Sequence, residues 1–170
     1  MKPIPLALLA SCLLGGRADQ VATAPPGRSE PPVVFSLGGW EEILKTSDSR
    51  TRVVLMLRLY NNSHTSVFVD PVIGQMCGTL ELRSRPAGSR GDGEAFYSTS
   101  SGDCGCTVDD LFRLMPHRSL ERRMEIWYPT ARLSPSMEFW AEYDSRPLAE
   151  CGPGAYGALM KSNAITIPVV

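Results

Sequence analysis

Cysteines are the residues in this sequence whose chemistry depends most on their surroundings. Four of the five lie beyond residue 70, at Cys77, Cys104, Cys106 and Cys151. An even number of cysteines in an oxidising compartment is typical of disulfides, and four allow three pairings. One residue separates Cys104 from Cys106, so a bond between them would close a small, strained ring. We therefore predict two structural disulfides, in which Cys104 and Cys106 each reach a distant partner, Cys77 or Cys151.

Two other kinds of chemistry compete for the same side chains. Cys104 and Cys106 form a Cys-x-Cys pair, which a thiol-redox protein could use to exchange disulfides. A zinc site usually draws on paired Cys-x-x-Cys knuckles or on histidines. Only Cys104-Gly105-Cys106 is clustered in the sequence. Disulfides are therefore the favoured interpretation, and we expect neither a metal nor another cofactor.

The N-terminus carries the pattern of a secretory signal peptide. Lys2 precedes a short apolar run, and the small residues Gly15, Gly16 and Ala18 follow it. Such a layout predicts export, with cleavage after Ala18. A second cleavage site stays open, because Leu9-Ala10-Ser11-Cys12 resembles a bacterial lipobox, in which Cys12 would be the site of lipid attachment. The apolar run is too short to span a bilayer as a permanent helix.

Three segments follow from this reading of the chain. Residues 1–18 are the predicted signal peptide, residues 19–32 a flexible Pro-rich linker, and residues 33–170 one domain. We expect a periplasmic or extracellular protein that meets a membrane only through a lipid anchor at Cys12. Lys and Arg number 17 against 18 Asp and Glu, with no basic stripe, so the sequence does not favour a nucleic-acid partner.

Alternating apolar and polar residues predict an all-β domain. The clearest example is the run from Arg52 to Tyr60, where Val53, Leu55, Leu57 and Leu59 share one face of an extended strand. Several similar short runs follow, with turn-forming residues between them and no long helical pattern. About seven short strands arranged in this way are typical of an antiparallel β-sandwich.

Three groups of residues also resemble the immunoglobulin-like modules of bacterial secreted proteins and lipoproteins. In those modules a hydrophobic strand ends in an Asn-rich turn, a leucine–proline–turn–strand unit follows, and a later strand carries aromatic residues. The matching residues are Leu57, Leu59, Asn61 and Asn62, then Leu114, Pro116 and Ser119, then Phe139 and Tyr143. The resemblance covers roughly Val53 to Val170 and implies an immunoglobulin-like fold without a function.

Two tryptophans are the candidate binding residues. Trp127 and Trp140 each fall opposite the aliphatic stripe of a predicted strand. If the two strands were neighbours in a hairpin, the rings would form an exposed aromatic patch, which is typical of a binding surface. The alternative is that another element, such as the segment from Trp40 to Lys45, covers them.

No group of residues in the sequence matches a known catalytic motif, so we expect no enzyme activity. A Gly-x-Ser-x-Gly motif is absent, and the two histidines, His64 and His117, lie in predicted turns. The favoured function is an exported, non-enzymatic binding or envelope-structural module with an unknown protein partner. A protease inhibitor is the first alternative, presenting either residues 84–93 or, preferably, the cysteine-held residues 98–106. A thiol-redox protein that uses Cys104 and Cys106 is the second.

Overall fold

The structure is a computed structural model that describes residues 30–38, 43–45, 50–101 and 104–168. The predicted signal peptide, with Cys12, and all of the predicted linker before residue 30 lie outside the described residues. The described part confirms the all-β prediction. It contains short 3-10 helices and eleven strands, and every pairing between these strands is antiparallel.

The first sheet is built around one long central strand. Strand β3 pairs along its whole length with β8, and its other edge is shared by β1 and β2. The bounds of these strands are β1 (Val33–Gly38), β2 (Ile43–Lys45), β3 (Arg50–Asn61) and β8 (Ser119–Pro129).

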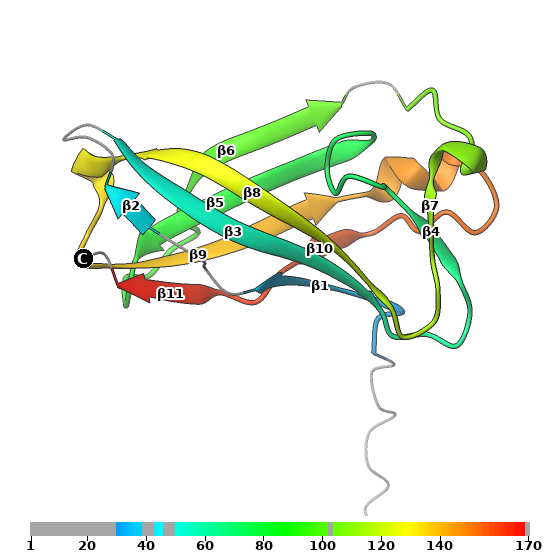
Figure 1. The fold of residues 1–170 in the computed structure, drawn as a ribbon, viewed down its shortest axis with the longest axis horizontal. Helices are drawn as coiled ribbons and strands as arrows, with labels where there is room; N and C mark the ends of the chain where they lie inside the picture. The colour runs from blue at the N-terminus through cyan, green and yellow to red at the C-terminus, as the bar shows by residue number, and fades with distance from the viewer. Residues whose placement is uncertain (1–29, 39–42, 46–49, 102–103, 169–170) are drawn as a thin grey trace, which may run out of the picture.

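The second sheet follows the order β10-β9-β5-β6, with β11 also paired to β9. Its strands are β5 (Gly78–Pro86), β6 (Glu94–Ser101), β9 (Ser136–Asp144), β10 (Leu159–Lys161) and β11 (Ile165–Pro168). A small two-stranded sheet lies apart from it at one end of the molecule (Figure 1). The remaining elements are β4 (Val67–Val69) and β7 (Phe112–Leu114), which form the small sheet, and the 3-10 helices η1 (Val108–Asp110), η2 (Thr130–Arg132) and η3 (Arg146–Cys151).

The two larger sheets share one hydrophobic core. Figure 1 shows β3 and β8 crossing in front of the sheet that contains β5, β6 and β9. The predicted apolar face of β3 is buried, with Leu55, Leu57 and Leu59 at most 1% exposed. These side chains belong to the same buried cluster as Leu82 of β5 and Phe139 of β9. Full burial of each such side chain stabilises the fold by about 1.5–3 kcal/mol.

The structure does not confirm the predicted count of about seven strands. Eleven strands are present among the described residues, and three of those beyond the expected set, β2, β7 and β10, have only three residues each. Three residues are too few to show an alternating pattern, so periodicity could not predict them. Among the described residues, no helix has the length and apolar character needed to cross a membrane.

Candidate functional site

A buried tryptophan on the outer side of the second sheet forms the centre of the candidate site. Trp140 lies on β9 between Phe139 and Ala141, which both belong to the core. Because side chains alternate along a strand, Trp140 points away from that core. Its side chain is nevertheless only 4% exposed. Something on the outer face must therefore cover it.

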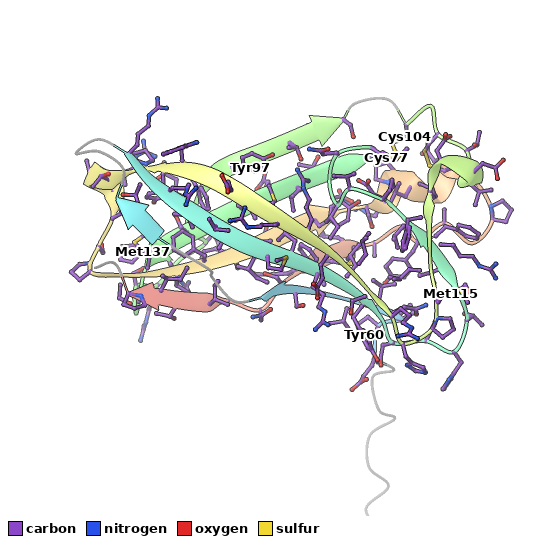
Figure 2. All side chains as sticks on the ribbon, viewed as in Figure 1. Tyr60, Cys77, Tyr97, Cys104, Met115 and Met137 are labelled. Carbon is purple, nitrogen blue, oxygen red and sulfur yellow. A yellow bond between two sulfur atoms is a disulfide. The ribbon has the colours of Figure 1, made fainter. Side chains whose placement is uncertain are left out.

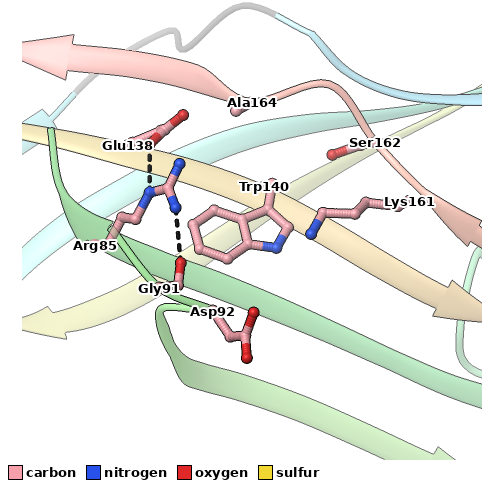
Figure 3. Close-up of a pocket in the computed structure, with 8 residues that line it drawn as sticks. All are labelled: Arg85, Gly91, Asp92, Glu138, Trp140, Lys161, Ser162 and Ala164. Carbon is pink, nitrogen blue, oxygen red and sulfur yellow. Dashed lines mark hydrogen bonds and ion pairs between the residues drawn. The ribbon is translucent and has the colours of Figure 1, made fainter. Parts of the chain in front are cut away.

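Two cationic side chains lie against the Trp140 indole. Figure 3 shows Arg85 and Lys161 on either side of the ring. The guanidinium carbon of Arg85 is 5.3 Å from the ring centroid, and Nζ of Lys161 is 5.2 Å from it. At these distances both cations are attracted to the negative face of the aromatic ring. They come from β5 and β10, so three strands build the site.

Carboxylates from the same face neutralise the two cations. Nε of Arg85 donates a hydrogen bond of 2.5 Å to Glu138, and Nζ of Lys161 lies 3.2 Å from Oε1 of Glu142. The indole Nε1 of Trp140 also donates to Oε1 of Glu142, at 3.2 Å. The indole thus has a hydrogen-bond partner in addition to its cationic neighbours.

Electrostatics at the site favours the charged forms of Arg85 and Glu142. The hydrogen bond to Glu138 raises the pKa of the Arg85 guanidinium above its ordinary value, in spite of partial desolvation. For Glu142, burial alone would raise the pKa of the carboxyl. Hydrogen bonds from Trp140 and Lys161, together with the charge of Arg83, outweigh burial and hold the pKa of Glu142 below its ordinary value. The site is therefore a network of charges at neutral pH.

The connection between β5 and β6 covers Trp140. A Cβ atom added to Gly93 would lie 2.2 Å from Cη2 of Trp140 and 2.8 Å from the Ser84 carbonyl oxygen. Gly93 also has a φ of +67°, a backbone conformation that favours glycine. Only glycine therefore lets the chain pass this close to the indole. The loop thus covers the indole at Gly93, whereas residues 40–42 of the other proposed covering segment lie outside the described residues.

Two arginines of β5 hold the backbone of this connection, which we call the β5–β6 loop (residues 87–93). Nη1 of Arg85 donates to the Gly91 carbonyl at 2.7 Å, and Nη1 of Arg83 donates to the Asp92 carbonyl at 3.3 Å. The amide of Ala87 donates to the Ser136 carbonyl at 2.9 Å. The loop is thus exposed at its side chains and fixed through its main chain.

Beside the loop lies a pocket of about 280 Å³. Its wall carries cationic, anionic and hydroxyl groups around the buried indole (Figure 3). The lining residues are Arg85, Gly91, Asp92, Glu138, Trp140, Lys161, Ser162 and Ala164. Ligand pockets commonly start at about 300 Å³. This pocket has the size for a small polar molecule or for one polar side chain of a partner protein.

Trp127 and Trp140 do not form the exposed aromatic patch that was one of the two alternatives for them. Trp127 lies on β8 of the first sheet and is 52% exposed, whereas Trp140 lies on β9 of the second sheet and is buried. The patch required β8 and β9 to be neighbours in a hairpin, but β8 pairs with β3 and β9 with β5. Although β8 and β9 follow each other in the sequence, they belong to different sheets.

The cysteines pair with distant partners, as the sequence predicted. Cys77 is bonded to Cys104, and Cys106 to Cys151. Cys104 and Cys106 are therefore not bonded to each other. Two such bridges indicate a non-cytoplasmic environment. Figure 2 shows Cys77 and Cys104 at the end of the molecule that also carries β4 and β7.

The two disulfides lie in direct contact. Sγ of Cys77 is 3.7 Å from Sγ of Cys106, and the sulfurs of Cys77, Cys106 and Cys151 all lie within 4.8 Å of one another. Cys77 and Cys151 are buried, whereas Cys104 and Cys106 are half-buried. Both half-buried cysteines line an open pocket of about 290 Å³, together with Met76, Gly105 and Asp110.

A buried carboxylate that the sequence analysis did not single out positions the chain before Cys77. Asp70 is fully buried and accepts hydrogen bonds from the backbone amides of Val72, Gln75 and Met76, at 2.8 to 3.1 Å. The Tyr143 hydroxyl also donates to it, at 3.4 Å. The three amides follow Asp70 within six residues of the chain, whereas Tyr143 reaches it from β9.

Comparisons with known proteins leave the function open. No family model matches the chain, and no curated protein matches it. The solved structures that are similar to this chain include one described as the X-ray structure of Northeast Structural Genomics Consortium target SoR45. The two chains are 9% identical with a TM-score of 0.43, over 81% of this chain and 87% of that chain. At this level of similarity neither a fold family nor a function follows for this chain.

Proposed function

We propose that this chain is an exported, non-enzymatic binding module, and that its binding surface is the β5–β6 loop together with the Trp140 pocket. The observation that carries this proposal is the way the loop is held. Its main chain is fixed by Arg83 and Arg85, and it packs over Trp140 through Gly93. A loop that is ordered before it meets a partner loses less conformational entropy on binding.

The chemistry of the pocket indicates the kind of partner. Asp92 and Lys161 are exposed at its wall, while the Arg85 and Glu138 side chains are joined deeper in it. A partner protein could place one polar side chain in the pocket while its surface covers the exposed residues of the loop. We therefore propose a protein partner whose contact surface carries both donors and acceptors, since the pocket offers both.

We also propose that the two facing sheets form an immunoglobulin-like sandwich. The order β1-β3-β8 corresponds to strands A, B and E of that fold, and the order β10-β9-β5-β6 to strands G, F, C and C′. Export is the setting we propose for it. The two disulfides support an oxidising compartment, and the N-terminal pattern of the sequence supports a signal peptide.

Site-specific photo-crosslinking in the secreting cells tests the proposed surface. A photo-reactive residue would replace Ala87, an exposed residue of the β5–β6 loop. The matched control would replace Ala149, which is also an exposed alanine and belongs to η3 at the other end of the molecule (Figure 1). We expect one discrete protein adduct from position 87 that is absent from position 149. The same adducts from both positions, or none from position 87, would contradict the proposal.

Protease inhibition is the second candidate function, and the anchored loop favours it. Arg90 is exposed within the β5–β6 loop. Just before it, the Ser89 amide donates to the Pro86 carbonyl, and just after it, Arg85 donates to the Gly91 carbonyl. Proteases of the trypsin type accept a basic side chain in a pocket that carries an aspartate. Recovery of a protease in the adduct from position 87, with loss of its activity, would favour this candidate. An adduct with a protein that is not a protease would exclude it as the function of that contact.

A further inference from the structure

We propose that the four cysteines form a thiol–disulfide exchange site, in which reduction at the surface moves a disulfide to the central pair Cys77–Cys106. This inference is independent of the Trp140 pocket, which lies on a different part of the second sheet. It also differs from a Cys104–Cys106 redox pair, because the bond that forms is between Cys77 and Cys106.

The geometry places the sulfur of Cys77 beside the sulfur of Cys106. Cys77 and Cys106 belong to different bridges, yet their Sγ atoms are 3.7 Å apart. Exchange proceeds when a thiolate attacks a disulfide sulfur and displaces the other sulfur of that bond. A thiolate released at Cys77 therefore needs little movement to attack the neighbouring bridge at Cys106.

Exposure limits the entry of an external thiol to the half-buried Cys104 and Cys106, and only attack at Cys104 releases Cys77, the sulfur that lies beside Cys106. Cys77 is fully buried, whereas Cys104 is half-buried and lines the pocket formed with Met76 and Asp110. The segment that leads to Cys77 is held by the buried carboxylate of Asp70, through the amides of Gln75 and Met76. Asp70 is thus a positioning residue that keeps the Cys77 sulfur against Cys106 after the Cys77–Cys104 bridge has opened.

The proposed reaction uses a dithiol as reductant. One thiolate of the dithiol attacks Sγ of Cys104, which forms a mixed disulfide and releases the Cys77 thiolate. The Cys77 thiolate attacks Sγ of Cys106, forms the Cys77–Cys106 bond and displaces the Cys151 thiolate, which takes up a proton. The second thiol of the dithiol then resolves the mixed disulfide, so that the dithiol leaves oxidised by two electrons and Cys104 is released as a thiol. Two protein disulfides have become one, at a new position, with two protein thiols.

Single cysteine variants of the full chain test the exchange by alkylation and disulfide mapping. In Cys104→Ser, we expect the majority of molecules to carry the Cys77–Cys106 bond with Cys151 alkylated. In Cys151→Ser, we expect the same central bond with Cys104 alkylated. The control Cys77→Ser removes a partner of the central bond, so Cys104 should be alkylated and the Cys106–Cys151 bond kept.

Retention of the native disulfide pairing in the variants would contradict the proposal. If Cys104→Ser keeps the Cys106–Cys151 bond and leaves Cys77 as a free thiol, no transfer occurs and the proposal fails. Rearranged bonds in the control as well would show unselective exchange and also overturn it. Should the variants not fold, wild-type protein treated with limiting dithiothreitol and quenched with acid gives the same answer. The first reduced species should contain free Cys104 and Cys151, and a species with free Cys77 and Cys104 would contradict the proposal.

Discussion

At the scale of single residues, charged groups with several partners hold the candidate site together. Glu142 is the clearest case, because it contacts Trp140, Lys161 and Arg83 at once. Its lowered pKa means that the ionised carboxylate is favoured by the folded state. Stability from such a group is fully present above the pKa of the unfolded chain and is lost as the pH falls through the lowered folded pKa.

Glu142→Gln should therefore reduce the loss of unfolding free energy that occurs as the pH falls. The ordinary pKa of this carboxyl is 4.5, so we expect wild type and variant to diverge most above about that pH and to converge below it. At neutral pH the variant should lose about 0.2–1 kcal/mol, because the ion pairs are partly exposed. Urea unfolding between pH 3 and pH 7 measures this difference. A constant gap between the two proteins over the whole range would contradict the assigned pKa.

At the scale of elements, the β5–β6 loop determines whether Trp140 is buried. Its close approach to the indole depends on Gly93, whereas Gly88 in the same loop has open space around it. Both glycines have positive φ angles, of +67° and +79°. The two positions therefore share the backbone requirement and differ in packing.

Gly93→Ala should destabilise the protein more than Gly88→Ala. Alanine at either position pays about 1–2 kcal/mol for the left-handed backbone conformation. Only at position 93 does the new methyl group also collide with Trp140 and Ser84, which adds about 1–3 kcal/mol. Chemical denaturation of the two variants gives the difference directly. Equal losses of unfolding free energy would show that the loop does not pack on the indole as described.

Alternation of apolar and polar residues predicts those strands that are long and that bury one face. This alternation predicts strand β3, and ring strain predicts that Cys104 and Cys106 bond to distant cysteines. The Trp140 site does not, because Arg85, Glu138 and Lys161 come from three strands that only the sheet order brings together. Periodicity places Trp140 opposite the core face, but it cannot show that a loop folds back over that side.

At the scale of the whole molecule, the two candidate sites lie near opposite ends of β5. The β5–β6 loop and the Trp140 pocket lie where β5 ends, and the disulfides lie near Cys77, directly before β5 begins. Strand β5 thus connects a proposed binding surface to a proposed exchange site. The disulfides pack in a second buried cluster with Leu111 and Leu148, apart from the shared core of the two sheets.

The most direct test of the proposed binding surface is the affinity of the protein that crosslinks at position 87. Binding by the wild-type chain would be compared with Asp92→Asn, which changes an exposed charge at the pocket wall, and with Asp109→Asn, an exposed aspartate of η1 outside the pocket. We predict that Asp92→Asn weakens binding by roughly tenfold, about 1.4 kcal/mol, while Asp109→Asn leaves it unchanged. Wild-type affinity in Asp92→Asn, or an equal loss in both variants, would contradict the assignment of the binding surface to the Trp140 pocket.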